Sequence, residues 1–521
     1  MKRISSPWLV IGLMMTLAGV LALSSTPAAG QGFTTSDPVI RRIWEIGMNN
    51  SRAEEIAQVM LDSIGPRLTG SPAMDRAQRW AVGLIRSWGI DARNEQYGTW
   101  RGWDRGITHI DLIQPRVRTL EGTMMAMSPG TNSRPVEGPV TIVPEWQTEE
   151  ELENWIRSTR GKFVALAFPQ PTCRPDSHYS QYGSPGALDR LREEREVALQ
   201  DFRIHVPSQN SLRLRVEAAG ALGTLESSWS NDIGVNKIFS TNTSRMPSID
   251  LSCEDYGLVW RLAANGQGPV VRLTAESRFT ATVPVNNTIG EIRGRELPDE
   301  YVMLSAHFDS WDSASGATDN GTGSTVMLEA LRILGEAYPN PRRTILIGLW
   351  GGEEQGLIGS RRYAAANPGV VEGMQALFNQ DNGTGRIQSI TGNGLVSSGA
   401  HLGDWLARVP DALKQGLTLE LPGIPGSGGT DHSSFVCFGA PAFGLNAANW
   451  SYGIHTWHTN RDTFDKVVFE DVRINAVLTA MLVYLASEDT RIERELRVMP
   501  TSPNGQPGQW PICQPGQAAF E

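Results

Sequence analysis

The chain has 521 residues, of which 40% are hydrophobic and 20% charged, so its composition is that of a globular protein too long for one small core. We expect two domains. Its formal net charge of −10 and the lack of a long Lys/Arg run exclude a nucleic-acid-binding protein, because attraction to phosphate needs basic patches.

The first 30 residues predict a secretory signal peptide. Lys2 and Arg3 precede an apolar stretch from Trp8 to Leu23, and the small-residue segment STPAAGQ follows. Cleavage is expected near Gly30. The alternative is an uncleaved membrane anchor, since the apolar stretch approaches the length of a short span. No later segment is apolar enough to cross a bilayer, so we expect a secreted or periplasmic protein without stable membrane insertion.

Export makes the four cysteines candidates for two disulfides, with three possible connectivities. Bridges within domains would pair Cys173 with Cys253 and Cys437 with Cys513, but the sequence alone does not choose among the three. The scattered spacing does not resemble a zinc knuckle.

Residues 31–118 are predicted to form an N-terminal helical part of the main domain. Helical spacing appears at Ile56, Met60 and Ile64, and again at Leu84 and Trp88, on either side of the turn signal GPRLTGSP. Residues 119–277 contain the short β-like runs VTIVP, KFVALAF and VVRLTA and one charged helical stretch, LDRLREEREVALQDF. This segment is predicted to be an inserted β-rich domain.

Residues 278–493 alternate between short apolar runs and helical patterns. The predicted strands are VMLS (302–305), TILIGLW (344–350), QALFNQD (375–381) and PAFGLN (441–446), and the predicted helices are 325–334, 357–366 and 472–487. The alternation predicts an α/β fold with a mixed, mostly parallel sheet sandwiched by helices. Ligands of such sheets collect outside the carboxyl ends of the strands. The Pro/Gly-rich tail, residues 494–521, is predicted to lie extended over the surface.

Polar side chains gather where these strands end. Each has an ordinary explanation by itself, such as turn chemistry or the helix dipole. Adjacent carboxylates such as Glu353 and Glu354, however, repel each other unless a positive charge lies beside them. Imidazoles and carboxylates at several strand ends are the groups that bind zinc. The candidates are His307, Asp309, Asp319, Glu353, Glu354, Asp381 and His458.

Six motifs carry a resemblance to a known family. HFDS, GATDNGTG, LWGGEEQGLIGS, FNQD, GTDHSSF and HTNRDT, in this order and spacing, resemble the zinc-dependent exopeptidases of peptidase family M28. The motif region covers about residues 286–467, and IGPRLTGSP is similar to family members as well. The insert resembles a protease-associated domain through AAGALGTLE and MPSIDLSCEDYG. The motifs look closest to those of carboxypeptidase Q-like and bacterial aminopeptidase-like members.

The resemblance implies two Zn²⁺ ions per chain. His307 and Asp381 would bind one ion, Glu354 and His458 the other, and Asp319 would bridge them. The family also implies that Asp309 fixes the tautomer of His307. It further implies a cis peptide after Asp319.

Adjacent residues at a strand end point in different directions, so Glu353 can act as general base while Glu354 binds metal.

Three neighbouring residues leave alternatives open. His455 could compete with His458, although the H-x-x-x-D-T frame from His458 to Thr463 matches the family. His432 is expected either to line the substrate pocket or to have a structural role with Asp431. Trp457 stands where many members carry Tyr, which leaves the oxyanion donor unassigned.

The sequence therefore predicts a secreted di-zinc exopeptidase acting on short peptides. Aminopeptidase action is preferred, and a carboxypeptidase Q-like dipeptidase is the alternative. A non-catalytic receptor or binding protein on the same scaffold is a further one, which intact ligands and Glu353 disfavour. The insert is expected either to cap the cleft or to mediate pairing into a homodimer. The chain lacks the G-x-S-x-G elbow of serine hydrolases and the GKS/T ending of a phosphate loop.

Overall fold

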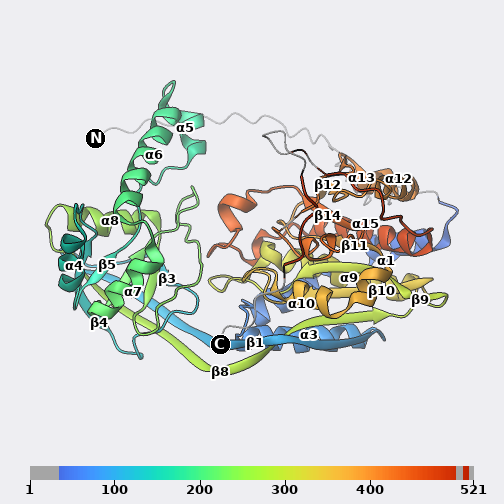
Figure 1. Cartoon of the computed structure of the whole chain (residues 1–521), viewed down its shortest axis with the longest axis horizontal. Helices are drawn as coiled ribbons and strands as arrows, with labels where there is room; N and C mark the ends of the chain where they lie inside the picture. The colour runs from blue at the N-terminus through green and yellow to red at the C-terminus, as the bar shows by residue number, and fades with distance from the viewer. Residues whose placement is uncertain (1–34, 427, 500, 502–507, 515–521) are drawn as a thin grey trace, which may run out of the picture.

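A computed structural model describes residues 35–426, 428–499, 501 and 508–514. These residues form two lobes connected by two long strands (Figure 1). The predicted signal peptide, residues 1–30, lies outside the described residues. In the part of the chain that is described, no helix combines the length and the apolar character needed to cross a membrane.

The larger lobe is built on a mixed sheet with the strand order β13-β12-β14-β11-β9-β10-β8, and β1 pairs with β8. The pairs β9–β10, β9–β11, β11–β14 and β12–β13 are parallel, whereas β8–β10, β12–β14 and β1–β8 are antiparallel. The mostly parallel sheet is as predicted. The strands are β1 (Asp91–Gln114), β8 (Val270–Ile292), β9 (Leu297–His307), β10 (Arg343–Trp350), β11 (Met374–Asn379), β12 (Ile387–Thr391), β13 (Thr418–Glu420) and β14 (Ala442–Ala447).

Helices cover both faces of this sheet. The helices of this lobe are α1 (Pro38–Asn49), α2 (Ala53–Gln58), η1 (Val59–Ile64), α3 (Pro72–Ser87), η2 (Ala317–Gly321), α9 (Thr322–Ala337), α10 (Ile358–Ala366), α11 (Pro368–Gly373), α12 (Ser398–Arg408), α13 (Asp411–Lys414), α14 (Ser433–Val436), η3 (Tyr452–Thr456), η4 (Phe464–Lys466) and α15 (Phe469–Glu488). Side chains of α1, α9 and α15 pack on one face, and those of α10, α11 and α14 pack on the other.

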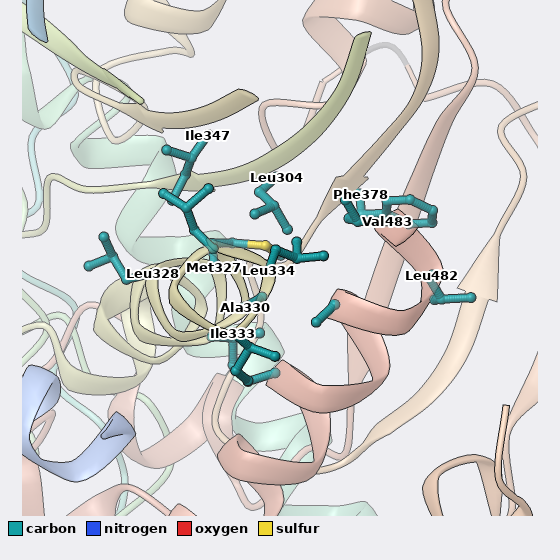
Figure 2. Packing of buried hydrophobic residues seen from close by; sticks show 14 of the residues in the cluster. Leu304, Met327, Leu328, Ala330, Ile333, Leu334, Ile347, Phe378, Leu482 and Val483 are labelled. Atoms are coloured by element: carbon teal, nitrogen blue, oxygen red, sulfur yellow. The ribbon is translucent and has the colours of Figure 1, made fainter. Parts of the chain in front are cut away.

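The strands serve both faces because successive side chains point in opposite directions. In β9, Leu304 joins the cluster of α9 and α15, while Met303 joins the cluster of α10 and α14. Figure 2 shows Leu304 and Ile347 of the sheet near Met327 of α9, and Phe378 of the sheet near Val483 of α15. A strand that is apolar on both sides forms a continuous apolar run in the sequence, which is why these strands were predictable.

The strands of the smaller lobe continue the same sheet, because β4 pairs antiparallel with β8. Strands β4, β5, β6 and β7 are parallel neighbours, and β3 is antiparallel to β7. The elements are β2 (Arg118–Thr119), β3 (Gly122–Met124), β4 (Val136–Ile142), α4 (Glu149–Ser158), β5 (Phe163–Ala165), α5 (Asp176–Tyr182), α6 (Ala187–His205), α7 (Gln209–Ala219), β6 (Gly223–Glu226), β7 (Ser248–Leu251) and α8 (Cys253–Ala264).

Two features of this region differ from the sequence prediction. The insert is α/β rather than β-rich, because it contains the helices α4 to α8 beside short strands. The predicted helical part also does not extend to residue 118, because Asp91–Gln114 is the long strand β1. Strands β1 and β8 pair along most of their length and run through both lobes (Figure 1). The predicted boundary at residue 277 therefore falls inside the continuous strand β8.

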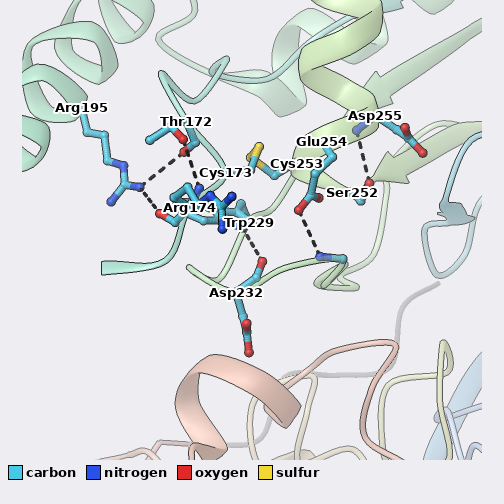
Figure 3. Close-up of a disulfide and its surroundings, with 11 residues drawn as sticks. Thr172, Cys173, Arg174, Arg195, Trp229, Asp232, Ser252, Cys253, Glu254 and Asp255 are labelled. Atoms are coloured by element: carbon cyan, nitrogen blue, oxygen red, sulfur yellow. Dashed lines mark hydrogen bonds between the residues drawn. A yellow bond between two sulfur atoms is a disulfide. The ribbon is translucent and has the colours of Figure 1, made fainter. Parts of the chain in front are cut away.

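The structure has two disulfides, one within each lobe. Cys173 is bonded to Cys253, which begins α8, and Cys437 is bonded to Cys513. These are the within-domain pairs among the three connectivities that the sequence left open. Figure 3 shows the first bridge beside the loop that contains Trp229 and Asp232. The second bridge ties the tail to the residue after α14.

Candidate metal centre

The polar residues singled out in the sequence lie at the carboxyl ends of neighbouring parallel strands. His307 is the last residue of β9, Glu353 and Glu354 follow β10, and Asp381 follows β11. Gly352 has a φ of 70°, which lets the chain turn sharply after β10. Asp319 lies in η2, and His458 follows η3. The edge of the sheet therefore brings together residues that are up to about 150 positions apart in sequence.

Two groups of three form around Asp319. Nε2 of His307 lies 2.9 Å from Oδ1 of Asp381 and 3.4 Å from Oδ1 of Asp319. Nε2 of His458 lies 3.0 Å from Oε2 of Glu354 and 3.3 Å from Oδ2 of Asp319. The two oxygens of Asp319 therefore face different histidines. Each group offers one nitrogen and two carboxylate oxygens within 4.8 Å of one another.

Two oxygens of this cluster lack hydrogen-bond donors. Oδ2 of Asp319 and Oε1 of Glu354 are buried and accept no hydrogen bond within the described residues. Burial, with the charge of Asp319, raises the pKa of Glu354 well above its usual value. Burial, with the charges of Asp381 and Asp431, likewise raises the pKa of Glu353. Buried carboxylates without donors and two imidazoles are a donor set that fits zinc.

Asp309 organises the loop after β10. Its carboxylate accepts hydrogen bonds from the backbone amides of Glu353 at 3.2 Å and Glu354 at 3.3 Å, and from Oγ1 of Thr69 at 3.2 Å. Nδ1 of His307 donates a hydrogen bond to the main-chain carbonyl of Asp309 at 3.0 Å, whereas the Asp309 carboxylate lies 3.7 Å from Nδ1. Asp309 thus orients His307 mainly through its backbone and orients the two glutamates through its side chain.

Asp462 holds the segment that carries Asp319. Its carboxylate accepts hydrogen bonds from the backbone amides of Thr318 at 2.7 Å and Asp319 at 3.0 Å. The peptide between Asp319 and Asn320 is cis, as the family resemblance implied. Asp462 belongs to the same loop as His458, so this contact couples the position of the shared carboxylate to that of one histidine.

Two residues at the centre were not identified from the sequence. Arg67 is fully buried and donates to the carbonyls of Phe308 at 2.7 Å, Ser315 at 2.8 Å and Gly316 at 3.0 Å. Its presence in the IGPRLTGSP segment was the available signal. Tyr452 donates a hydrogen bond that helps to lower the pKa of Asp319, after the larger effects of His307 and His458. No sequence pattern pointed to Tyr452.

The geometry separates the neighbouring histidines. Nδ1 of His455 lies 2.6 Å from Oδ2 of Asp232 in the insert, so His458 rather than His455 joins the cluster. His432 belongs to neither group of three and has no hydrogen bond to Asp431 among the described residues. Burial lowers the pKa of His432 to about 4. Trp457 stacks on His458 with ring centroids 3.9 Å apart.

Comparison with known proteins identifies the same region. Residues 287–483 match the model of peptidase family M28. The chain is 24% identical over 442 residues to carboxypeptidase Q from Mus musculus, covering 85% of this chain and 87% of that protein. It is 23% identical over 445 residues to carboxypeptidase Q from Homo sapiens, covering 85% and 86%.

Solved structures share the fold. A peptidase M28 precursor from Shewanella amazonensis superposes with a TM-score of 0.64 at 24% identity, covering 87% of this chain and 97% of the other. A zinc aminopeptidase from Bacillus subtilis superposes with a TM-score of 0.53 at 17% identity, covering 85% and 97%. The M28 motifs lie on the expected strand ends within residues 287–483, so this region is a peptidase family M28 domain and the chain is a metallopeptidase.

Proposed function

We propose that this chain is a di-zinc exopeptidase that trims short peptides. His307 and Asp381 would hold one ion, Glu354 and His458 the other, and Asp319 both. The observation that carries this proposal is the position of the Asp319 carboxylate between two histidines. Its Oδ1 lies 3.4 Å from Nε2 of His307, and its Oδ2 lies 3.3 Å from Nε2 of His458. One carboxylate shared between two imidazole–carboxylate pairs is what a two-metal site requires.

The zinc ions would supply Lewis acidity, which makes water a nucleophile near neutral pH and polarises a peptide carbonyl. Glu353 would accept the proton of the attacking water and pass it to the leaving amine. Its raised pKa, caused by burial and then by neighbouring carboxylates, suits a group that must both take up and release a proton. Asp309 would keep Glu353 in place because its carboxylate accepts a hydrogen bond from the backbone amide of Glu353 at 3.2 Å.

The end of the peptide that is trimmed is a separate question. We prefer aminopeptidase action, since many relatives with this site bind a free amine terminus. The alternative is dipeptide hydrolysis, because the relatives that cover 85% of the chain are named carboxypeptidase Q. The two disulfides and the apolar stretch near the N-terminus favour a secreted or periplasmic enzyme.

A digest of a peptide library tests the proposal. Purified protein is first assayed for zinc, with an expected content of two ions per chain. It is then incubated with free, amino-blocked and carboxyl-blocked peptides, with and without a chelator, and the products are scored for the trimmed end. We expect hydrolysis that the chelator abolishes and added zinc restores. A zinc-loaded protein that cleaves none of these peptides would instead be the non-catalytic binding protein.

A further inference from the structure

We propose that Lys237 binds the free carboxylate of a short peptide whose scissile bond lies at the metal centre. This inference rests on the exopeptidase function proposed above and adds a specificity residue to it. Lys237 belongs to the insert, so the proposal also gives the smaller lobe a part in substrate recognition.

The backbone of Lys237 lies beside the loop that carries His458. Lys237 and Thr459 form an antiparallel bridge, and the amide of Ile238 donates to the carbonyl of His458 at 2.8 Å. The amide of Asn236 donates to Oδ1 of Asn460 at 2.9 Å, and the amide of Asn460 donates to the carbonyl of Asn236 at 3.0 Å. These bonds hold the lysine next to one of the candidate metal ligands.

The side chain of Lys237 places its charge close to the metal centre. Nζ lies 4.0 Å from the centroid of the Trp457 ring, and that ring stacks on His458 at 3.9 Å. The ammonium is therefore no more than about 8 Å from the imidazole, roughly the length of two extended residues at about 3.6 Å each. Phe239 and Trp311 add apolar surface around His458, with ring centroids 5.1 Å and 5.9 Å away.

Lys237 differs from the other cations along this contact between the lobes. Arg461 pairs with Glu121, and His455 pairs with Asp232 at 2.6 Å. Within the described ranges, no carboxylate lies at ion-pair distance from Nζ of Lys237, whose hydrogen bond goes to the carbonyl of Gly453 at 3.4 Å. A half-buried ammonium without a counter-ion is costly in free energy, and a bound carboxylate would offset that cost.

The distance favours one source of carboxylate. A peptide cleaved at the metals continues beyond its scissile bond, and a dipeptide places its terminal carboxylate one residue further on. This reach fits the separation between Lys237 and His458.

Burial lowers the pKa of Lys237 to about 8. The side chain is thus largely protonated at pH 7 and able to bind an anion. An ordinary structural role, a cation held on the face of Trp457, is the competing explanation.

Matched substrates separate the two explanations. We would measure kcat and KM for a free dipeptide and for the same dipeptide with an amidated C-terminus, using wild type, Lys237→Met and Lys237→Arg. Methionine keeps much of the length and loses the charge. We expect Lys237→Met to raise KM for the free dipeptide about tenfold and to change KM for the amidated dipeptide less than about twofold. Only the free form offers a carboxylate to a charged donor. Lys237→Arg should keep most of the preference.

Lys466→Met is the control, because Lys466 is also partly buried but pairs with Asp465 at 2.6 Å. It should leave the ratio of the two substrates unchanged. If Lys237→Met lowered kcat/KM equally for both substrates, the lysine would only position the loop. If kcat/KM stayed at the wild-type value for both substrates, the inference would also be overturned.

A binding experiment distinguishes failure of this inference from failure of the proposed function. Calorimetry on zinc-loaded Glu353→Gln compares the Kd of the free dipeptide with that of its amide, with and without Lys237→Met. We expect the free form to bind about tenfold more tightly and Lys237→Met to remove this difference. If wild type hydrolyses neither substrate, the exopeptidase proposal fails. If wild type hydrolyses both and Kd shows no preference for the carboxylate, only the role of Lys237 fails.

Discussion

The two lobes both bury carboxylates, but the insert supplies them with donors of its own. Glu226 accepts hydrogen bonds from Nε and Nη2 of Arg213 at 2.6 Å and 2.7 Å, and both side chains are nearly inaccessible. Glu217 accepts hydrogen bonds from the backbone amides of residues 244–246 at 2.8, 2.6 and 3.1 Å. The charges of Glu226 and Glu217 are therefore compensated within the fold.

The metal centre leaves two of its buried carboxylate oxygens without such compensation. Oδ2 of Asp319 and Oε1 of Glu354 accept no hydrogen bond in the described residues. The buried Arg67 nearby directs its donors to main-chain carbonyls. Removing a carboxylate from water is costly unless donors or a cation replace the water. The contrast between the lobes indicates that uncompensated carboxylates mark the place where an external cation belongs.

Glu353 is the exception among the carboxylates of the centre, and its substitution should have the strongest effect. It is partly buried but lies outside both candidate ligand groups. As general base, it should be needed for turnover but not for metal. Glu353→Gln should lower kcat by about 10²-fold to 10⁴-fold while the zinc content stays at the wild-type value. Steady-state kinetics and metal analysis of the same samples measure both quantities.

Glu372→Gln, at an exposed position, controls for the loss of one negative charge and should keep wild-type kcat. If Glu353→Gln retained more than about a tenth of the wild-type kcat, Glu353 would not be the base. If it lost zinc, Glu353 would be a ligand, and the division of roles between the adjacent glutamates would be wrong.

A second substitution tests whether the insert compensates its own charges. Arg213→Met leaves Glu226 buried without its cation, which should lower the free energy of unfolding by about 3–5 kcal/mol. The loss should be the same with and without zinc, because this pair lies in the insert. Urea unfolding in both conditions measures it. Arg213→Met combined with Glu226→Leu should recover most of the stability, and a double variant as unstable as the single one would argue against an uncompensated charge as the cause.

The catalytic fold was largely predictable because its strands are buried on both faces. TILIGLW and VMLS appear as continuous apolar runs, and both lie in the strands predicted from them. Strand β1 was missed for the opposite reason. Its register with β8 shifts near Gln96, Arg101 and Arg105, so side chains do not alternate regularly between buried and exposed. Predicting a strand from its pattern needs a constant period, and bulges remove it.

The candidate site was predictable where chemistry coincided with strand ends. Asp381, Glu354 and His307 could be found because a charged or polar group directly follows an apolar run. Arg67 and Lys237 could not, because their roles depend on contacts across the fold. Arg67 donates to Phe308, 241 residues later, and Lys237 meets Trp457 from another lobe. A single sequence without the fold does not show such contacts, and only the place of Arg67 in the IGPRLTGSP segment pointed to it.

The weakest effect is expected at Glu354, where the sign of a stability change tests the metal centre directly. Burial and then Asp319 raise the pKa of Glu354 in the folded, metal-free protein. A carboxyl group with a raised folded pKa contributes stability that is full below its unfolded pKa of about 4.3 and is lost as pH rises through the folded value. Glu354→Gln cannot ionise and escapes this loss. The advantage of the metal-free variant over wild type should therefore be small near pH 5 and should grow by about 1–2 kcal/mol by pH 8.

Zinc should reverse that order, because the cation stabilises the wild-type ligand set and a glutamine amide is a poorer zinc ligand than the carboxylate it replaces. Urea unfolding at pH 5 and pH 8, in chelator and in zinc, gives the four comparisons, with Glu372→Gln as a control that should show no crossover. A metal-free Glu354→Gln protein less stable than wild type at pH 8 would mean that the fold already compensates Glu354. The contrast between the lobes would then disappear, since Glu354, like Glu226 beside Arg213, would be a structural charge rather than half of an ion-binding pair.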